Sequence, residues 1–156
     1  MRMTLLAVTG KQPRWLDDAV EEYAKRLRPL LRVDFVDLKA ASRSQGRTTE
    51  TILTAEHKLI SAQIPAGAHV VALDERGASR TTERLSRDIA GWRQTGEHLV
   101  FVIGGPDGLA PDFKAAARET WALSQLTLPH GLAKLILVEQ LYRAASLLEG
   151  HPYHRA

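Results

Sequence analysis

The feature that most constrains the fold is a short apolar run, Leu99–Ile103, which stops abruptly at Gly104–Gly108 (Gly-Gly-Pro-Asp-Gly). A continuous apolar run bounded by turn residues is typical of a central strand that is buried on both faces of a parallel sheet. Parallel strands need long crossover connections, which are usually helices. The rest of the chain should therefore alternate between strands and helices.

The remaining sequence follows this alternation. The predicted strands are Met3–Thr9, Val33–Leu38, His69–Leu73 and Leu99–Ile103. The predicted helices are Arg14–Leu27, Thr51–Gln63, Thr82–Gln94, Pro111–Thr120 and Ala133–Leu148. We therefore expect an α/β fold, with a mostly parallel sheet and helices on both faces, in a single domain of residues 1–156.

Sheets of this kind bind ligands beyond the carboxyl ends of their strands. Three loops take that position in the predicted order of elements. They are Asp74–Gly77, Gly104–Gly108 and Leu123–Gly131. We expect any active site to lie among them.

Composition narrows the class of protein further. The chain has no cysteine, which excludes disulfides and thiolate metal sites. No apolar run reaches the roughly 18 residues that a membrane span needs, and the N-terminus lacks the pattern of a signal peptide. We expect a soluble, cytoplasmic protein. The net charge of +3 favours a polyanionic partner only slightly.

Two adjacent glycines, Gly104 and Gly105, directly follow the buried strand. They would let a ligand approach the backbone closely, but a tight turn with positive φ would require glycines equally well. The spacing matches neither the phosphate-binding P-loop nor the GxGxxG dinucleotide fingerprint.

The segment Leu123–His130 also allows two interpretations. It is either an edge strand that ends at Pro129, or an apolar slot whose backbone reads a base such as adenine.

The predicted helix Ala133–Leu148 is apolar around most of its surface, which indicates burial on more than one side. In a small domain the second face could pack against another copy, so we expect a homodimer. Tyr142 and Arg143 lie in the middle of this helix. Arg143 either forms a salt bridge with Glu139 one turn earlier or clamps a phosphate or carboxylate.

The tail His151–Arg155 combines an aromatic ring, two imidazoles and a guanidinium, a set that could stack on and pair with RNA. A metal site formed by His130, His151 and His154 is disfavoured, because no carboxylate accompanies them at a metal-binding spacing. A basic set could add an RNA-facing stripe, although a solvated surface is the usual explanation. Its members are Lys39, Arg43, Arg47, Arg76, Arg80, Arg84 and Arg87.

Four motifs occur in a fixed order: IGGPDG, W-x-L-S-x-L-T-L-P-H, E-x-L-Y-R-A and a terminal HPYHR. Together with L-D-x-x-G at Leu73–Gly77 and the matching length, they resemble the RlmH family over the whole chain. These enzymes are 23S rRNA pseudouridine N3-methyltransferases of the SPOUT class. Asp107 departs from the pattern, because the family more often has glutamate there.

The resemblance implies a fold that ties the C-terminal part of the chain into a trefoil knot, which topology rules alone would reject. It also implies a homodimer that binds S-adenosylmethionine and no metal. The implied cofactor-binding residues are Leu73, Gly104, Gly105, Leu123, Ser124, Gln125, Leu126, Thr127 and Leu128.

The implied reaction is methyl transfer to N3 of a pseudouridine in 23S rRNA within the assembled ribosome. A general base must remove the N3 proton, and His130, Glu139 and His154 are candidates. Tyr142, Arg143 and Arg155 would complete the catalytic set by stacking or by stabilising the anion. The alternatives are a related methyltransferase of another RNA, such as tRNA, or a non-catalytic ribosome-binding factor.

Overall fold

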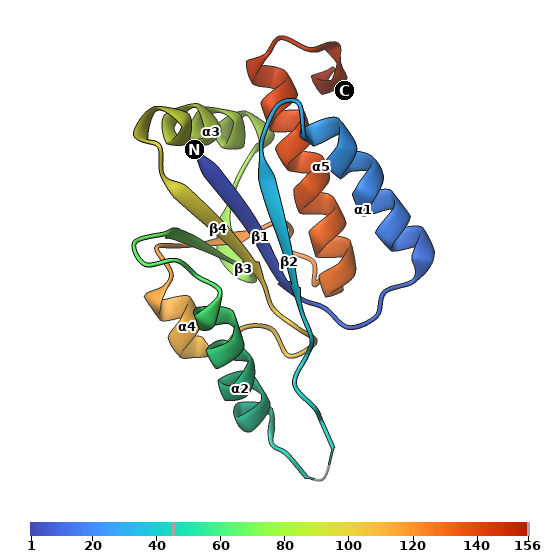
Figure 1. Ribbon diagram of the computed structural model, residues 1–156, viewed down its shortest axis with the longest axis vertical. Coiled ribbons are helices and arrows are strands. Elements are labelled where there is room, and N and C mark those ends of the chain that lie inside the picture. Colours follow the sequence, from blue (N-terminus) through green and yellow to red (C-terminus); the bar gives the residue numbers. More distant parts are fainter. Residues whose placement is uncertain (45, 156) are drawn as a thin grey trace.

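A sheet of five strands forms the centre of the molecule, in the order β2-β1-β4-β3-β5 (Figure 1). The computed structural model describes residues 1–44 and 46–155. The strands are β1 (Arg2–Val8), β2 (Val33–Leu38), β3 (His69–Ser79), β4 (His98–Ile103) and β5 (Glu119–Ala122). All pairings between neighbouring strands in this sheet are parallel, as predicted.

Helices cover both faces of the sheet. They are α1 (Arg14–Leu27), α2 (Thr49–Ala62), α3 (Thr82–Thr95), α4 (Pro111–Ala116) and α5 (His130–Leu148), followed by a short 3-10 helix, Pro152–His154. Helices α1, α3 and α5 pack on one face, and α2 and α4 pack on the other (Figure 1). The predicted α/β fold is confirmed. The trefoil knot stays a prediction.

Alternation along the central strands divides the core into two layers. In β4, Phe101 and its odd-numbered neighbours face α1, α3 and α5, whereas Val100 and Val102 face α2 and α4. Strand β1 alternates in the same way, with Leu5 in the first layer and Leu6 in the second. Successive side chains of a strand point to opposite faces, so a strand that is apolar throughout must be covered twice.

Local chemistry accounts for where several helices begin. The hydroxyl oxygen of Thr48 accepts the backbone N–H of Thr51 at 3.1 Å and caps α2. Thr81 caps α3 in the same way, through the N–H of Arg84 at 3.1 Å. Helix α5 begins directly after Pro129, earlier than the predicted Ala133. His130 therefore lies in its first turn.

Strand β3 is longer than the predicted His69–Leu73 and is interrupted. Leu73 and Ala78 both pair with Trp121, so residues 74–77 bulge out of the ladder. A Cβ on Gly77 would lie 2.6 Å from the carbonyl carbon of Trp121, which requires glycine there. The bulge takes the residues after Leu73 out of the β-ladder with β5.

Two predictions for the C-terminal third of the chain were wrong. Helix α4 ends at Ala116 and not at Thr120, because Glu119 and Thr120 pair with β3. The interpretation of Leu123–His130 as an edge strand was also wrong, because β5 ends at Ala122. Residues 123–128 leave the sheet as an irregular loop.

Candidate active site

A cavity of about 660 Å³ opens beside the bulge of β3 and the carboxyl ends of β4 and β5. Residues 73–76, 103–108 and 126–130 line it, together with Leu123, Ser124, Lys114 and Ala133. The structure thus brings together the three loops that were predicted from their position. Gln125, also predicted to contact a cofactor, lies outside this lining.

The glycines of the Gly104–Gly108 loop are required by contacts within the protein. A Cβ on Gly104 would lie 2.5 Å from the carbonyl carbon and oxygen of Gly108, which itself has a φ of 78°. The N–H of Gly108 donates to the carbonyl of Gly105 at 2.9 Å and closes the turn. The segment is therefore a tight turn, but the positive φ lies at Gly108 and not at Gly104 or Gly105. Residues of the turn line the cavity.

The loop after β5 forms the opposite wall. The hydroxyl oxygen of Ser124 accepts the N–H of Leu126 at 2.9 Å, and the Thr127 hydroxyl donates to Glu75 in the bulge of β3. Leu126 is 76% exposed, which is unusual for a leucine in a folded domain. This wall is therefore tied to the β3 bulge while it offers apolar surface at the rim.

An ionised carboxylate lies on the floor of the cavity. Asp74 accepts the N–H of Arg76 at 2.9 Å and the ammonium group of Lys114 at 3.0 Å. Burial opposes ionisation, but these two contacts outweigh it and lower the pKa of Asp74. No sequence pattern indicated Lys114, because it lies on α4, outside any of the motifs.

His130 enters the cavity from the first turn of α5. Its Nε2 lies 3.2 Å from the side-chain nitrogen of Gln12, in the loop after β1. Partial burial lowers the pKa of His130, so the imidazole is neutral at neutral pH. A neutral imidazole at a cavity wall can accept a proton.

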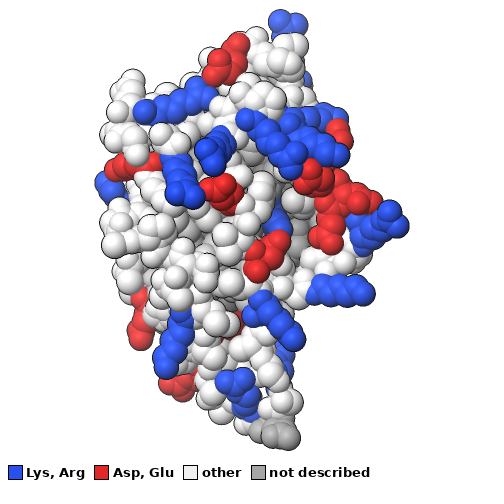
Figure 2. Space-filling model, in the orientation of Figure 1, with Lys and Arg blue, Asp and Glu red and all other residues white. Residues whose placement is uncertain are grey.

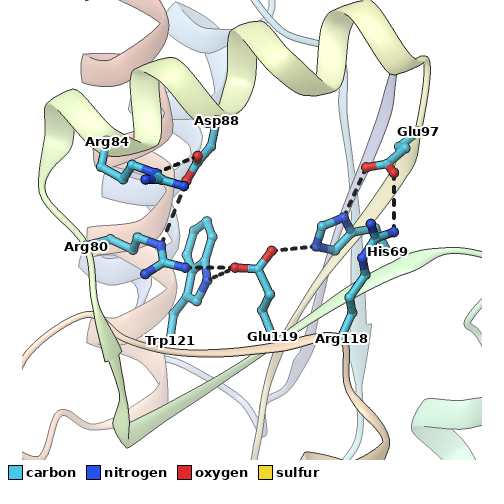
Figure 3. A network of polar contacts seen from close by, with 8 residues as sticks. All are labelled: His69, Arg80, Arg84, Asp88, Glu97, Arg118, Glu119 and Trp121. Atoms are coloured by element: carbon cyan, nitrogen blue, oxygen red, sulfur yellow. Dashed lines mark hydrogen bonds and ion pairs between the residues drawn. The ribbon is translucent and has the colours of Figure 1, made fainter.

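A network of polar contacts links the two ends of β3 to β5 (Figure 3). His69, at the start of β3, contacts Glu97 at 3.1 Å and Glu119 of β5 at 2.7 Å. Arg80, just after β3, donates to the same Glu119 at 2.8 Å and lies 5.0 Å from the centre of the Trp121 ring. Because β3 and β5 are cross-linked on both sides of the bulge, its cavity residues are held in place.

The other predicted catalytic residues lie at the far end of α5. At about 1.5 Å per residue, Arg143 is about 20 Å beyond His130 along the helix. Arg143 pairs with Glu139 at 2.9 Å, as the structural interpretation predicted, and its guanidinium lies 4.8 Å from the centre of the Tyr153 ring. Within one chain, Arg143 and His130 therefore do not share a site.

The tail folds back onto α5 in the same region. The Tyr153 hydroxyl donates to Glu139 at 3.2 Å, and its ring lies 4.5 Å from that of Tyr142, which is buried. Burial, together with the neighbouring Tyr23 and Glu139, raises the pKa of Tyr153. Arg155 is exposed. His154 belongs to the 3-10 helix by its backbone, but its side chain lies outside the described part of the structure.

The predicted basic stripe is not continuous. Arg43 pairs with Asp107, Arg80 with Glu119 and Arg84 with Asp88. Figure 2 shows basic and acidic side chains interspersed over the face in view. Among residues 1–44 and 46–155, we found no group of three or more His, Asp or Glu side chains that could hold a metal ion. Within the same residues, none of the helices is long and apolar enough to cross a membrane.

The fold is that of an α/β protein with a cavity at the carboxyl ends of its parallel strands. A solved structure described as a probable methylase family protein from Haemophilus influenzae shares this fold, with a TM-score of 0.55. The match covers 99% of this chain and 70% of that one, at 9% sequence identity. At this low identity the likeness concerns the fold alone.

The particular family follows from the sequence comparison. The family model described as "Predicted SPOUT methyltransferase" matches residues 1–154, and the chain belongs to this family of methyl-transferring enzymes. It is 47% identical to the ribosomal RNA large subunit methyltransferase H of Burkholderia multivorans and to that of Burkholderia vietnamiensis, over the full length of both chains. The same enzyme of Burkholderia ambifaria is 46% identical, again over both full chains. The resemblance to the RlmH family is thereby confirmed.

Proposed function

We propose that this enzyme transfers the methyl group of S-adenosylmethionine to N3 of a pseudouridine in 23S rRNA. The observation that carries the proposal is the cavity, in which the family motifs around Leu73, Gly104 and Leu123–Leu128 meet. The full-length similarity to relatives named for large-subunit rRNA supports the choice of substrate. Residues 1–156 would act as a single domain, in the cytoplasm, where ribosomes are.

The chemistry of the cavity fits this methyl donor. S-adenosylmethionine carries positive charge on its sulfonium and ammonium groups, which suits the carboxylates of Asp74 and Glu75. Lys114 and Arg76 lie beside them and suit its carboxylate. Leucine side chains offer apolar surface to its adenine. They are Leu73, Leu123, Leu126 and Leu128.

We assign the proton transfer to His130. When bound, S-adenosylmethionine supplies an electrophilic methyl group. N3 attacks as a nucleophile once its proton has been removed, and the neutral imidazole of His130 can accept that proton. Glu139 is less suited, since it lies further along α5 and is paired with Arg143. The Gly104–Gly108 loop and residues 123–128 would orient the donor, which supplies much of the remaining catalysis.

We further propose that the enzyme works as a homodimer in which α5 of each copy lies antiparallel to the other. Leu132, Ile136 and Leu147 remain half-buried on α5 at helical spacing. In a two-fold dimer the same patch meets itself, so the two ends of α5 exchange places. Arg143, Arg155 and the tail of one copy would then complete the cavity of the other, which they cannot reach within one chain.

Methylation assays on purified ribosomes and on bulk tRNA test the substrate. We expect incorporation into ribosomes, with mass spectrometry of the rRNA locating the methyl group on a pseudouridine. Incorporation of methyl groups only into tRNA would contradict the proposed rRNA substrate and favour a tRNA methyltransferase.

Mixing two inactive variants tests the shared site. One variant carries Gly104→Val in the cavity, and the other lacks residues 151–156. If each site needs a cavity from one copy and a tail from the other, mixed dimers regain one working site, and activity returns on mixing. Sedimentation that shows only monomer, or no recovery after subunit exchange has been verified, would contradict the dimeric arrangement.

A further inference from the structure

A buried carboxyl group lies against the cavity loop without a partner. Glu56, in the middle of α2, is only 2% exposed. Within the described part of the chain, neither of its carboxyl oxygens has a hydrogen-bond partner. An ionised carboxylate in such a place is costly, whereas an uncharged carboxylic acid is tolerated far better. The mechanism proposed above gives Glu56 no role.

Glu56 is aimed at the backbone of Gly105. A Cβ on Gly105 would lie 3.2 Å and 3.3 Å from the two carboxyl oxygens, and 3.3 Å from a methyl group of Val8 in β1. Gly105 itself lines the cavity, whereas Glu56 lies outside the lining. The carboxyl group therefore supports the turn from the side that faces α2.

An ion pair adjoins this contact. Arg43, in the loop between β2 and α2, donates to Asp107 of the cavity turn at 2.5 Å. Asp107 and Arg43 are also the charged groups that act on Glu56. Three segments distant in sequence thus bring Glu56, Asp107 and Arg43 together at the Gly104–Gly108 turn.

We propose that Glu56 is a positioning residue of the methyl-donor pocket, which holds the Gly104–Gly108 turn in its binding form as an uncharged acid. Arg43 balances the one charge that remains in the group, on Asp107. Ionisation of Glu56 places a second negative charge beside Asp107 and makes both acids compete for Arg43. The turn then moves, and affinity for the methyl donor falls.

The titration behaviour of Glu56 agrees with this geometry. Burial raises the pKa of Glu56, and the negative charge of Asp107 raises it further, whereas Arg43 and the nearby backbone of Ala41 act in the opposite direction. The uncharged form is therefore populated at a higher pH than for an ordinary glutamate. As the pH rises through this pKa, the binding form of the turn is lost.

Calorimetric titration with S-adenosylmethionine between about pH 5 and about pH 9 tests the proposal. Glu56→Gln keeps the shape of the acid but cannot ionise. We expect equal affinity for both proteins at the acidic end. Above the pKa of Glu56, the wild-type Kd should rise relative to that of the variant by up to about tenfold per pH unit. Glu50→Gln, an exposed position on the same helix, should follow the wild type.

Two further variants should move the midpoint in opposite directions. Arg43→Gln removes the cation that favours ionisation, so the rise in Kd should shift to higher pH. Asp107→Asn removes the opposing negative charge, so the rise should shift to lower pH. Arg43 lies on an exposed loop, which keeps the test valid even if substitution of the buried Glu56 impairs folding.

The inference rests on the proposed donor pocket, and the two can fail separately. If the wild type binds no donor at any pH, the pocket proposal fails and the role of Glu56 with it. If the donor binds but wild type and Glu56→Gln give parallel Kd profiles, only the role of Glu56 is overturned.

Discussion

At the scale of single residues, the cavity combines a neutral base with an ionised acid. His130 is kept uncharged by burial, whereas Asp74 is kept charged by Lys114 and a backbone N–H. Each group is therefore in the protonation state that its proposed role needs at neutral pH.

Substitution of His130 should separate catalysis from binding. We expect His130→Asn to lower the rate of methyl transfer by roughly 10²–10⁴-fold and to leave the Kd of the donor nearly unchanged. In the wild type the rate should fall as the pH drops through the pKa of His130, which lies below the usual value. The measurement is single-turnover methylation against pH. His98→Asn, at the amino end of β4, is the control. An undiminished rate for His130→Asn would show that another group accepts the proton.

Lys114→Met should weaken the folded protein in a pH-dependent way. The folded-state pKa of Asp74 is lowered, so its ionisation stabilises the protein above the unfolded pKa, and this stability is lost as the pH falls through the folded pKa. The variant should lose about 1 kcal/mol or less at neutral pH, because the pair is partly screened by solvent. The loss should shrink in acid. Urea unfolding at several pH values measures it, with the exposed Lys25→Met as a control.

The sequence indicated some of these residues and not others, for physical reasons. Leu73 and Gly104 end or follow apolar strands, so their place at the ligand edge could be predicted. Lys114 and Glu56 come from helices where nothing in the local pattern distinguishes them from surface or core residues. Asp107 has the partner Arg43, which no spacing rule could indicate across so long a separation in sequence.

At the scale of elements, turns and irregular segments are harder to predict from sequence than strands and helices. Strands β2 and β4 and helix α1 agree with prediction to within a residue, because apolar periodicity determines them. Strand β5 and the continuation of β3 beyond residues 74–77 were missed. Both depend on pairing between β3 and β5, which is a tertiary contact and leaves no periodic signal.

The Gly104–Gly108 turn should not tolerate even one methyl group at its first position. We expect Gly104→Ala to raise the Kd of the donor by at least tenfold, because its Cβ would overlap the backbone of Gly108. Gly91→Ala is the matched control. It lies within α3 with no neighbouring atom within 4 Å of the new Cβ, so it should stabilise the protein by about 0.5–1 kcal/mol. Calorimetry and thermal unfolding test the pair, and an unchanged Kd for Gly104→Ala would contradict the turn's role.

At the scale of the whole molecule, α5 holds two groups of proposed site residues at a fixed separation. His130 begins the helix at the cavity, and the tail packs against its other end through Tyr142 and Tyr153. Because a helix is stiff, a shift at one end does not bring the other closer. Cooperation between the two ends therefore requires a second copy of the chain.

Deletion of residues 151–156 should accordingly affect one activity only. We expect methylation of ribosomes to fall by at least tenfold, while the Kd for S-adenosylmethionine changes by less than about twofold, since the residues assigned to the donor all line the cavity and none belongs to the tail. Filter-binding and calorimetric measurements on the same preparation test this. Undiminished methylation would remove the tail from the active site.

The position of β5 has a consequence for how the chain folds. This strand has four residues, lies at the edge of the sheet and closes a long loop of chain when it pairs with β3. Pairings between residues far apart in the sequence form slowly in folding. One wall of the cavity continues directly from β5. A ligand that contacts both walls of the cavity would therefore also stabilise the pairing of β5 with β3. The protein saturated with methyl donor should then be more stable to unfolding than the free protein.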